Sequence, residues 1–309
     1  MIILFLCSVV LFSILLLYFL NENIREKKFK NQSYINENSL ILITGGCLGI
    51  GREIIHQLIT KYKCKIINLD IRKDEFSNIK NQYKEKIINI FCDLNNEQNF
   101  ENLLLENKIK IKEINFLINN AAIAFNLPFE KLTKEQIKST IQINLISPML
   151  LTKLLIGKKE ENKNLHIITM ASIMSHITSK NSSDYISSKW GLYGFHESLR
   201  AEYLHRKDIF FTIICPYIIN SGMFPNFKNP LPFILKVYNV KNITYEIIKT
   251  IVLKDKIVFF PKYSYIICFI AKFVPCFLMD FIQYYIFDFA IRDMGSRKDN
   301  NSLLNLKEK

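Results

Sequence analysis

The chain lacks the residue clusters that hold metal ions. Five histidines occur in 309 residues, and none forms an H-x-x-x-H pair or lies in a cysteine/histidine cluster. The seven cysteines are odd in number and show no metal-ligand spacing. Most of them lie in apolar runs, as buried reduced thiols do. The sequence therefore predicts no metal site, and it predicts a folded part that lies in a reducing compartment.

The chain also lacks any block of about five or six basic residues, although its formal net charge is +13. Its lysines are scattered among asparagine and isoleucine over the whole length. Scattered charge argues against a nucleic-acid partner. It favours attraction to an anionic membrane surface instead.

Residues 2–20 carry no charged side chain, and a helix of this length crosses a bilayer core of about 30 Å. A cleaved signal peptide needs a basic start and small residues at its cleavage site, and neither is present. Four basic side chains between residues 25 and 30 place the remainder of the chain on the cytoplasmic side. We therefore expect a transmembrane anchor over residues 1–20 and a polar linker over 21–38.

Short apolar runs alternate with helical periodicity between Ser39 and about Phe260. Such alternation is typical of parallel strands joined by crossover helices, which cover both faces of the sheet. The pattern predicts an α/β domain over residues 39–260 with a doubly wound, seven-stranded parallel sheet. The expected strands are 40–44, 65–70, 87–91, 114–118, 164–170, 209–215 and 257–260, and the clearest helices are 133–156 and 184–206.

The remaining segment, 261–309, is again apolar, but charged residues and Pro275 interrupt it. A second clean membrane span is therefore not expected. Amphipathic helices that lie on a membrane or cap an apolar pocket fit the pattern better. Ordinary core packing is the alternative.

A glycine-rich turn follows the first expected strand, in the segment Thr44-Gly45-Gly46-Cys47-Leu48-Gly49-Ile50-Gly51. Gly45 permits a tight turn, Gly49 lets the backbone approach phosphate, and Gly51 allows close packing of helix on strand. The following helix N-terminus favours anions. The sequence predicts a dinucleotide site here.

Asp70 ends the second expected strand, where a carboxylate accepts hydrogen bonds from a ribose 2′-hydroxyl and repels a 2′-phosphate. The next residue, Ile71, is not basic. NAD is therefore the expected cofactor, and NADP is the alternative because Arg72 lies close by.

Tyr185 and Lys189 are four residues apart at the start of a helical pattern, so their side chains share one face. The Tyr-x-x-x-Lys spacing occurs three times, but only this copy has a serine, Ser172, at the carboxyl end of the preceding expected strand. A unit charge about 4 Å away, at an effective dielectric near 20, is worth about 4 kcal/mol, or nearly three pKa units. The pattern predicts a phenol whose pKa Lys189 lowers toward neutrality, suited to proton transfer.

Together these motifs resemble the short-chain dehydrogenases/reductases. The likeness covers residues 39–260, and it is strongest with membrane-associated retinol dehydrogenases and 17β-hydroxysteroid dehydrogenases. The residues that carry it are Thr44-Gly45-x-x-x-Gly49-Ile50-Gly51, Asp93, Asn119-Asn120-Ala121, Asn144, Met170-Ala171-Ser172, Tyr185-x-x-x-Lys189 and Cys215-Pro216-Tyr217.

The resemblance implies a role for each matching position. Tyr185 would be the general acid/base, Lys189 would lower its pKa and hold the nicotinamide ribose, Ser172 would polarise the substrate oxygen, and Asn144 would position a water. The implied cofactor-binding residues are Thr44, Gly45, Gly49, Ile50, Gly51, Asp70, Asp93, Leu94, Asn119, Ala121, Tyr185, Lys189, Pro216, Ile219 and Ser221. Read singly, Asn144 is also typical of a buried amide, Asp93 of a helix cap and Ser172 of a strand end.

The apolar stretch from Met223 to Val240 offers little to bind a sugar or a charged acid. With an anchor and an apolar tail, it predicts oxidation of a retinoid, a steroid or a long-chain fatty alcohol at the endoplasmic reticulum membrane or the lipid-droplet surface. The resemblance implies a homodimer through the long helices. An NADP-dependent carbonyl reductase and a non-catalytic lipid-surface scaffold are the alternatives.

Overall fold

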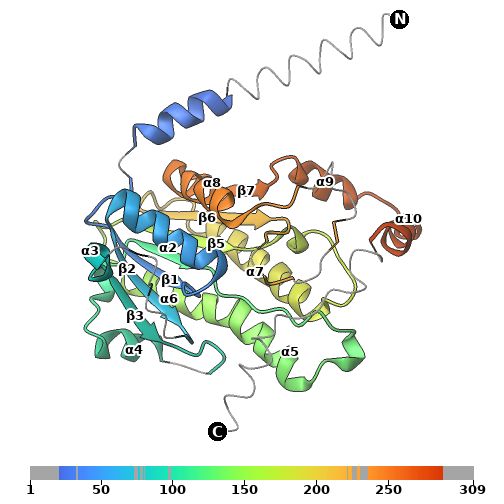
Figure 1. Cartoon of the computed structure of the whole chain (residues 1–309), viewed down its shortest axis with the longest axis horizontal. Helices are drawn as coiled ribbons and strands as arrows, with labels where there is room; N and C mark the ends of the chain where they lie inside the picture. The colour runs from blue at the N-terminus through green and yellow to red at the C-terminus, as the bar shows by residue number, and fades with distance from the viewer. Residues whose placement is uncertain are drawn as a thin grey trace, which may run out of the picture.

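A computed structural model describes residues 21–287 except 33, 73–75, 77, 78, 80, 97, 98, 221, 225–227 and 230–235. The expected anchor over residues 1–20 and the cofactor residue Ser221 lie outside the described residues. Figure 1 shows a central sheet between two layers of helices.

The sheet has seven parallel strands in the order β3-β2-β1-β4-β5-β6-β7, which confirms the expected doubly wound Rossmann-type architecture. Most strand residues are buried on both faces, which explains their continuous runs of isoleucine and leucine. The strands are β1 (Leu40–Thr44), β2 (Lys65–Asp70), β3 (Ile87–Phe91), β4 (Phe116–Asn119), β5 (Leu165–Met170), β6 (Ile209–Pro216) and β7 (Ile257–Phe260).

Two helices, α2 (Gly49–Tyr62) and α8 (Val240–Leu253), pack together on one face of the sheet. The core on the opposite face contains residues of the other long helices and of the same strands. The remaining elements before the tail are α3 (Asn81–Lys84), α4 (Phe100–Glu106), η1 (Ile111–Glu113), η2 (Phe129–Lys131), α5 (Lys134–Ile141), η3 (Gln142–Ile146), α6 (Ser147–Lys158), η4 (Ile173–Ser175) and α7 (Ser183–Glu202).

The expected helix 133–156 is continuous from Lys134 to Lys158 but contains a π-helical turn, η3, at its centre. Among the described residues it is the one helix whose length and mean hydropathy of 1.3 would suit a membrane span. Leu151 and Leu155 are buried against the sheet, so its apolar character belongs to the core.

The segment expected as a polar linker is helical over residues 21–30, and this N-terminal helix is held against the domain (Figure 1). Arg25 donates two hydrogen bonds to Asp255 at 2.9 and 2.5 Å. Glu26 pairs with Lys249 at 2.8 Å and accepts a hydrogen bond from Tyr245. A Tyr-x-x-x-Lys pair that sequence spacing alone would place in solvent therefore anchors this helix.

The apolar tail forms α9 (Ser264–Ala271), α10 (Cys276–Ile282) and η5 (Gln283–Phe287). These elements follow β7 and lie at the side of the molecule where the strands end (Figure 1). The part of the tail beyond 287 lies outside the described residues.

Candidate active site

A cavity of about 620 Å³ lies at the carboxyl ends of the strands. Open parallel sheets bind ligands at this edge, because the strand order reverses there and the crossover loops leave a crevice. Of the residues expected from sequence, those that line it are Gly45, Gly49, Ile50, Gly51, Asp70, Asp93, Leu94, Ala121, Ser172, Tyr185, Lys189, Pro216 and Ile219. Thr44, Asn119 and Asn144 do not line it.

The glycine-rich turn is tied to the end of β4. The Thr44 hydroxyl accepts hydrogen bonds from the backbone amides of Asn120 and Ala121, at 3.1 and 3.0 Å. The Asn120 side-chain amide donates to the carbonyl oxygens of Thr44 and Gly45, at 2.9 and 3.0 Å. Asn120, which sequence reasoning left without a role beside Asn119, is therefore the residue that holds the turn.

Two glycines of the turn have a steric reason to be glycine. Gly45 has a φ of +69°, a conformation that side chains disfavour. A Cβ atom at Gly51 would lie 2.2 Å from the Gly45 carbonyl oxygen and 2.6 Å from the Asn120 amide nitrogen. Leu48 supplies no side-chain cap to α2, so the first amides of that helix remain free to bind an anion. The turn fits the pyrophosphate of a dinucleotide.

Asp70 is held at the cavity wall by two backbone amides. Its carboxylate accepts hydrogen bonds from Cys47 and Arg72, both at 2.9 Å. Asp93 accepts a hydrogen bond from the Asn95 amide at 3.0 Å and also lines the cavity. Asp93 therefore both bonds the backbone of the following turn, as a helix cap would, and lines the cavity, as the resemblance implied.

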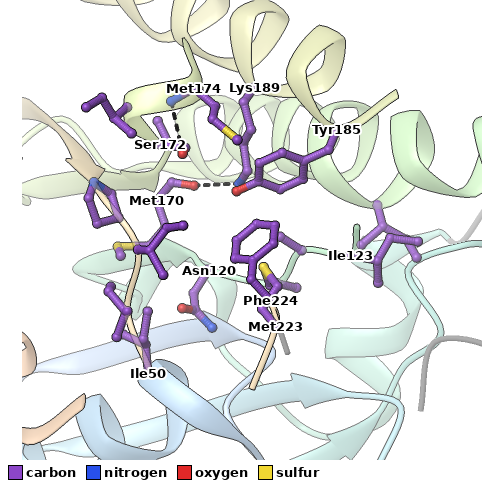
Figure 2. Close-up of a pocket in the computed structure, with 18 of the residues that line it drawn as sticks. Ile50, Asn120, Ile123, Met170, Ser172, Met174, Tyr185, Lys189, Met223 and Phe224 are labelled. Atoms are coloured by element: carbon purple, nitrogen blue, oxygen red, sulfur yellow. Dashed lines mark hydrogen bonds between the residues drawn. The ribbon is translucent and has the colours of Figure 1, made fainter. Parts of the chain in front are cut away.

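Ser172, Tyr185 and Lys189 meet in one wall of the cavity (Figure 2). Ser172 begins η4 and accepts a hydrogen bond from the Met174 amide at 3.1 Å. Tyr185 and Lys189 lie one turn apart on α7, with the Lys189 ammonium 5.6 Å from the centre of the Tyr185 ring. This ammonium donates to the Met170 carbonyl oxygen at 2.8 Å.

The expected lowering of the Tyr185 pKa is wrong for this arrangement. Burial raises the pKa of Tyr185 to about 12, and its hydrogen bond with Ser172 only partly opposes that effect. Burial also lowers the pKa of Lys189 to about 8. The expected lowering considered only the attraction between the phenolate and an ammonium about 4 Å away. Burial removes water from both groups and so disfavours their charged forms.

Asn144 lies in the π-helical turn and is bonded to protein groups. It exchanges two hydrogen bonds, each 2.9 Å long, with the backbone of Ile123, and it donates to the Ser188 hydroxyl at 3.0 Å. Ser188 in turn donates to the Tyr185 carbonyl oxygen at 2.6 Å. The expected role of Asn144 in positioning a water stays a prediction, and these partners fix its side chain beside the turn that carries Tyr185. Ser188 had no sequence signal beyond lying three residues after Tyr185.

Asn119 is likewise placed behind the cavity. Its side-chain amide donates to the Thr152 hydroxyl at 3.2 Å, which joins the end of β4 to α6. Asn119 therefore links the end of β4 to α6, and its neighbour Asn120 provides the contacts to the glycine-rich turn.

The rest of the cavity wall is apolar. Phe224 packs edge-on against Tyr185 with ring centres 5.7 Å apart, and Met223 lies beside it (Figure 2). The tail closes the far side, and Gln283 donates to the Thr178 hydroxyl at 2.8 Å. The tail residues that line the cavity are Ile267, Ile270, Ala271, Val274, Met279, Ile282 and Gln283. The sequence left open whether the tail lies on a membrane, caps a pocket or packs in the core. The described residues show that it caps the cavity.

The doubly wound sheet, glycine turn and carboxylate define a dinucleotide-binding protein, and the Ser172–Tyr185–Lys189 wall is that of an oxidoreductase. The chain belongs to the short-chain dehydrogenase family, whose model matches residues 39–231. It is an enzyme of the NAD(P)-dependent class.

The chain is similar to named members of this family. It is 28% identical over 218 residues to the uncharacterized oxidoreductase TDA5 of Saccharomyces cerevisiae, a match that covers 69% of this chain and 65% of that protein. It is 26% identical over 241 residues to human 17-beta-hydroxysteroid dehydrogenase 13, covering 76% and 79%. A 4-hydroxyisoleucine dehydrogenase solved with NADH shares the fold, with a TM-score of 0.61, 23% identity and coverage of 69% and 90%.

Proposed function

We propose that this protein is a membrane-anchored, NAD-dependent dehydrogenase of lipophilic alcohols, such as retinoids, steroids or long-chain fatty alcohols. The observation that carries the proposal is the placement of Ser172 and Tyr185 in a cavity that apolar side chains of Met223, Phe224 and the tail also line. The similarity to 17-beta-hydroxysteroid dehydrogenase 13 supports a lipid substrate.

The proposed chemistry divides between bound cofactor and protein side chains. Bound NAD would accept hydride from the alcohol carbon. Tyr185, in its phenolate form, would take the hydroxyl proton at its phenolic oxygen, and Ser172 would hold the substrate oxygen next to it. Lys189, fully buried one turn away, would meet the cofactor ribose and stabilise the phenolate with its charge. Asn144 acts as a positioning residue, because through Ser188 it supports the helical turn that carries Tyr185.

Asp70 supports NAD over NADP. Two backbone amides fix its carboxylate at the wall, where a 2′-phosphate would meet an uncompensated negative charge. Arg72 lines the same cavity and is the feature that favours the alternative, an NADP-dependent carbonyl reductase.

The endoplasmic reticulum membrane or the lipid-droplet surface is the proposed location, with the catalytic domain on the cytoplasmic side. The uncharged sequence of residues 2–20 and the basic residues after it support this placement. A homodimer stays a prediction.

Substitution Tyr185→Phe tests the proposed function. NADH formation from a panel of retinol, steroid and long-chain alcohols, assayed in detergent or vesicles, should fall at least about a hundredfold, because the proton acceptor is gone. NADH binding, measured by fluorescence, should persist because the glycine turn is untouched. Retained turnover would refute the role of Tyr185, and tighter binding of NADPH than NADH would favour the reductase. A wild-type chain that binds NADH but oxidises no alcohol in the panel would favour the scaffold.

A further inference from the structure

The outer side of α9, α10 and η5 presents large apolar side chains to solvent. We define the tail face by six of them, Ile266, Phe269, Phe273, Phe277, Phe281 and Tyr284, which are each more than half exposed. Phe273 and Phe277 are 72% and 75% exposed. Phe269 and Phe273 pack edge-on with ring centres 5.1 Å apart. Large exposed apolar side chains gathered on successive elements mark a binding site, since solvent contact with them is unfavourable.

The tail face lies directly over the cavity. Ile267, Val274 and Met279 point inward and line the cavity from the same helices. Ile270 both lines the cavity and is 55% exposed, so it lies at the boundary between cavity and tail face. Ile270 is therefore a side chain that a lipid outside the protein and a substrate inside the cavity can both contact.

The charges around the tail face suit a phospholipid surface. α9 contains no charged residue, and the exposed Lys272 follows its last residue. A basic side chain at the rim of an apolar helical face binds lipid phosphates, and tyrosines prefer the interfacial region. Asp280 is the single acidic residue within α10.

The described N-terminal helix is joined to the start of the tail. Glu22 forms an ion pair with Lys262, two residues before α9 begins. Lys249 lies 3.7 Å from the same carboxylate, and Arg25 is fixed to Asp255. The first residues that the structure describes therefore lie beside the start of α9.

We propose that the tail face docks on a phospholipid surface, and that substrate enters the cavity from that surface at Ile270. The entry route rests on the proposed function, whereas the docking does not. A second copy of the chain on this face would close the boundary at Ile270. The pairing of Glu22 with Lys262 joins the described N-terminal helix to the start of the tail, and the uncharged sequence that precedes this helix favours a lipid surface over a second copy.

Brominated lipids test the docking, because they quench tryptophan fluorescence only at short range. In the full-length chain, Trp190→Phe removes the one native tryptophan, and Phe277→Trp then reports on the tail face. The matched control is Leu204→Trp, at a side chain that is 66% exposed. Leu204 precedes β6 and so lies toward the amino ends of the strands, whereas the tail follows the carboxyl end of β7. Both chains are reconstituted in phosphatidylcholine vesicles with or without brominated acyl chains.

We expect bromination to reduce the emission of the Phe277→Trp chain and to leave that of the Leu204→Trp chain unchanged. Equal emission of the Phe277→Trp chain in both kinds of vesicle would overturn the proposal. Emission that instead changes with protein concentration would assign the tail face to a second copy. NADH binding by each variant confirms folding. Quenching in a chain that oxidises no alcohol would keep the docking and refute only the proposed function.

The entry route has a kinetic test of its own. The double variant Phe273→Glu, Phe277→Glu should raise KM for an alcohol dissolved in vesicles and leave KM for a short, water-soluble alcohol unchanged. Phe129→Glu, at an equally exposed phenylalanine on η2, is the control. Equal KM changes for both substrates would refute entry from the lipid.

Discussion

At the scale of single residues, burial decides the electrostatics of the site. Tyr185 and Lys189 are 4% and 2% exposed, and each pays for the loss of water when it carries a charge. Their pKa values therefore move apart, from the nearly equal ordinary values of 10.0 and 10.5 to about 12 and about 8. Formation of a phenolate at Tyr185 beside a charged Lys189 is therefore less favourable than in water, until a bound ligand or substrate restores the missing polar contacts.

The buried Lys189 ammonium makes stability depend on pH. Between pH 8 and 10.5 the unfolded chain binds more protons at this lysine than the folded chain does, so stability rises with pH across that window. At pH 7 the substitution Lys189→Met should raise the free energy of unfolding, by at most about 3 kcal/mol. Urea unfolding at pH 7 and pH 10 checks this, because the advantage of the variant should shrink as pH rises. An advantage that is the same at both pH values would contradict the assignment.

The carboxylate of Asp70 should set the choice of dinucleotide. Asp70→Ser removes the negative charge that faces a 2′-phosphate and keeps a hydroxyl acceptor for the two backbone amides. The ratio of NADPH to NADH affinity should rise at least about tenfold, or about 1.4 kcal/mol. Fluorescence titration of both cofactors measures this ratio. An unchanged ratio would move the discrimination to another residue.

Sequence reasoning identified the reacting side chains but not the residues that position them. The spacing of Tyr185 and Lys189 on one helix face follows from 3.6 residues per turn, and the strand end at Ser172 follows from its apolar run. The role of Asn120 depends on where two carbonyl oxygens of the turn lie, which no local pattern specifies. The partners of Asn144 depend equally on the approach of Ile123 and Ser188 from other segments.

At the scale of elements, strands were easier to predict than the connections between them. The apolar runs of β1, β2 and β7 have the expected bounds, because a strand buried on both faces leaves an uninterrupted signal. The edge strand β3 also has the expected bounds, although Ile88 and Phe91 are exposed. The N-terminal helix was mistaken for a linker because its polar side chains pair with residues far away in sequence. Arg25 and Asp255, for example, are separated by 230 positions.

The ion pairs of the N-terminal helix should help to hold this helix against the domain. Arg25→Ala removes two hydrogen bonds to the half-buried Asp255 carboxylate and should destabilise the folded chain by about 1–2 kcal/mol. Lys30→Ala is the control, because that side chain is 69% exposed and its pair with Glu26 spans 3.8 Å. Urea unfolding compares the two. Equal midpoints for both variants would show that Phe29, buried against Tyr245, holds the helix without the ion pairs.

At the scale of the whole molecule, the fold could be predicted because local and global patterns agree. Alternation of strands and helices predicts a parallel sheet covered by helices, and the glycine turn after the first strand favours the doubly wound form that the observed strand order shows. The position of the tail over the cavity could not be predicted. Its sequence pattern favours a pocket or a membrane over a core but does not choose between the first two, and only the contacts of both helix faces distinguish them.

The cavity draws its wall from the ends of β1, β2, β4, β5 and β6, so a dinucleotide bound there should stabilise the domain as one unit. At an NADH concentration of about 100 times its Kd, the gain is about 2.7 kcal/mol, which should raise the thermal midpoint by roughly 5 °C or more. Gly51→Ala should abolish this shift, because its Cβ would displace the Gly45 carbonyl oxygen and the Asn120 amide. Gly157→Ala, a helical glycine whose Cβ would meet nothing within 4 Å, should retain the full shift and gain up to about 1 kcal/mol from helix propensity. Differential scanning fluorimetry with and without NADH separates the two, and a shift that survives in the Gly51→Ala chain would place the dinucleotide away from the glycine turn.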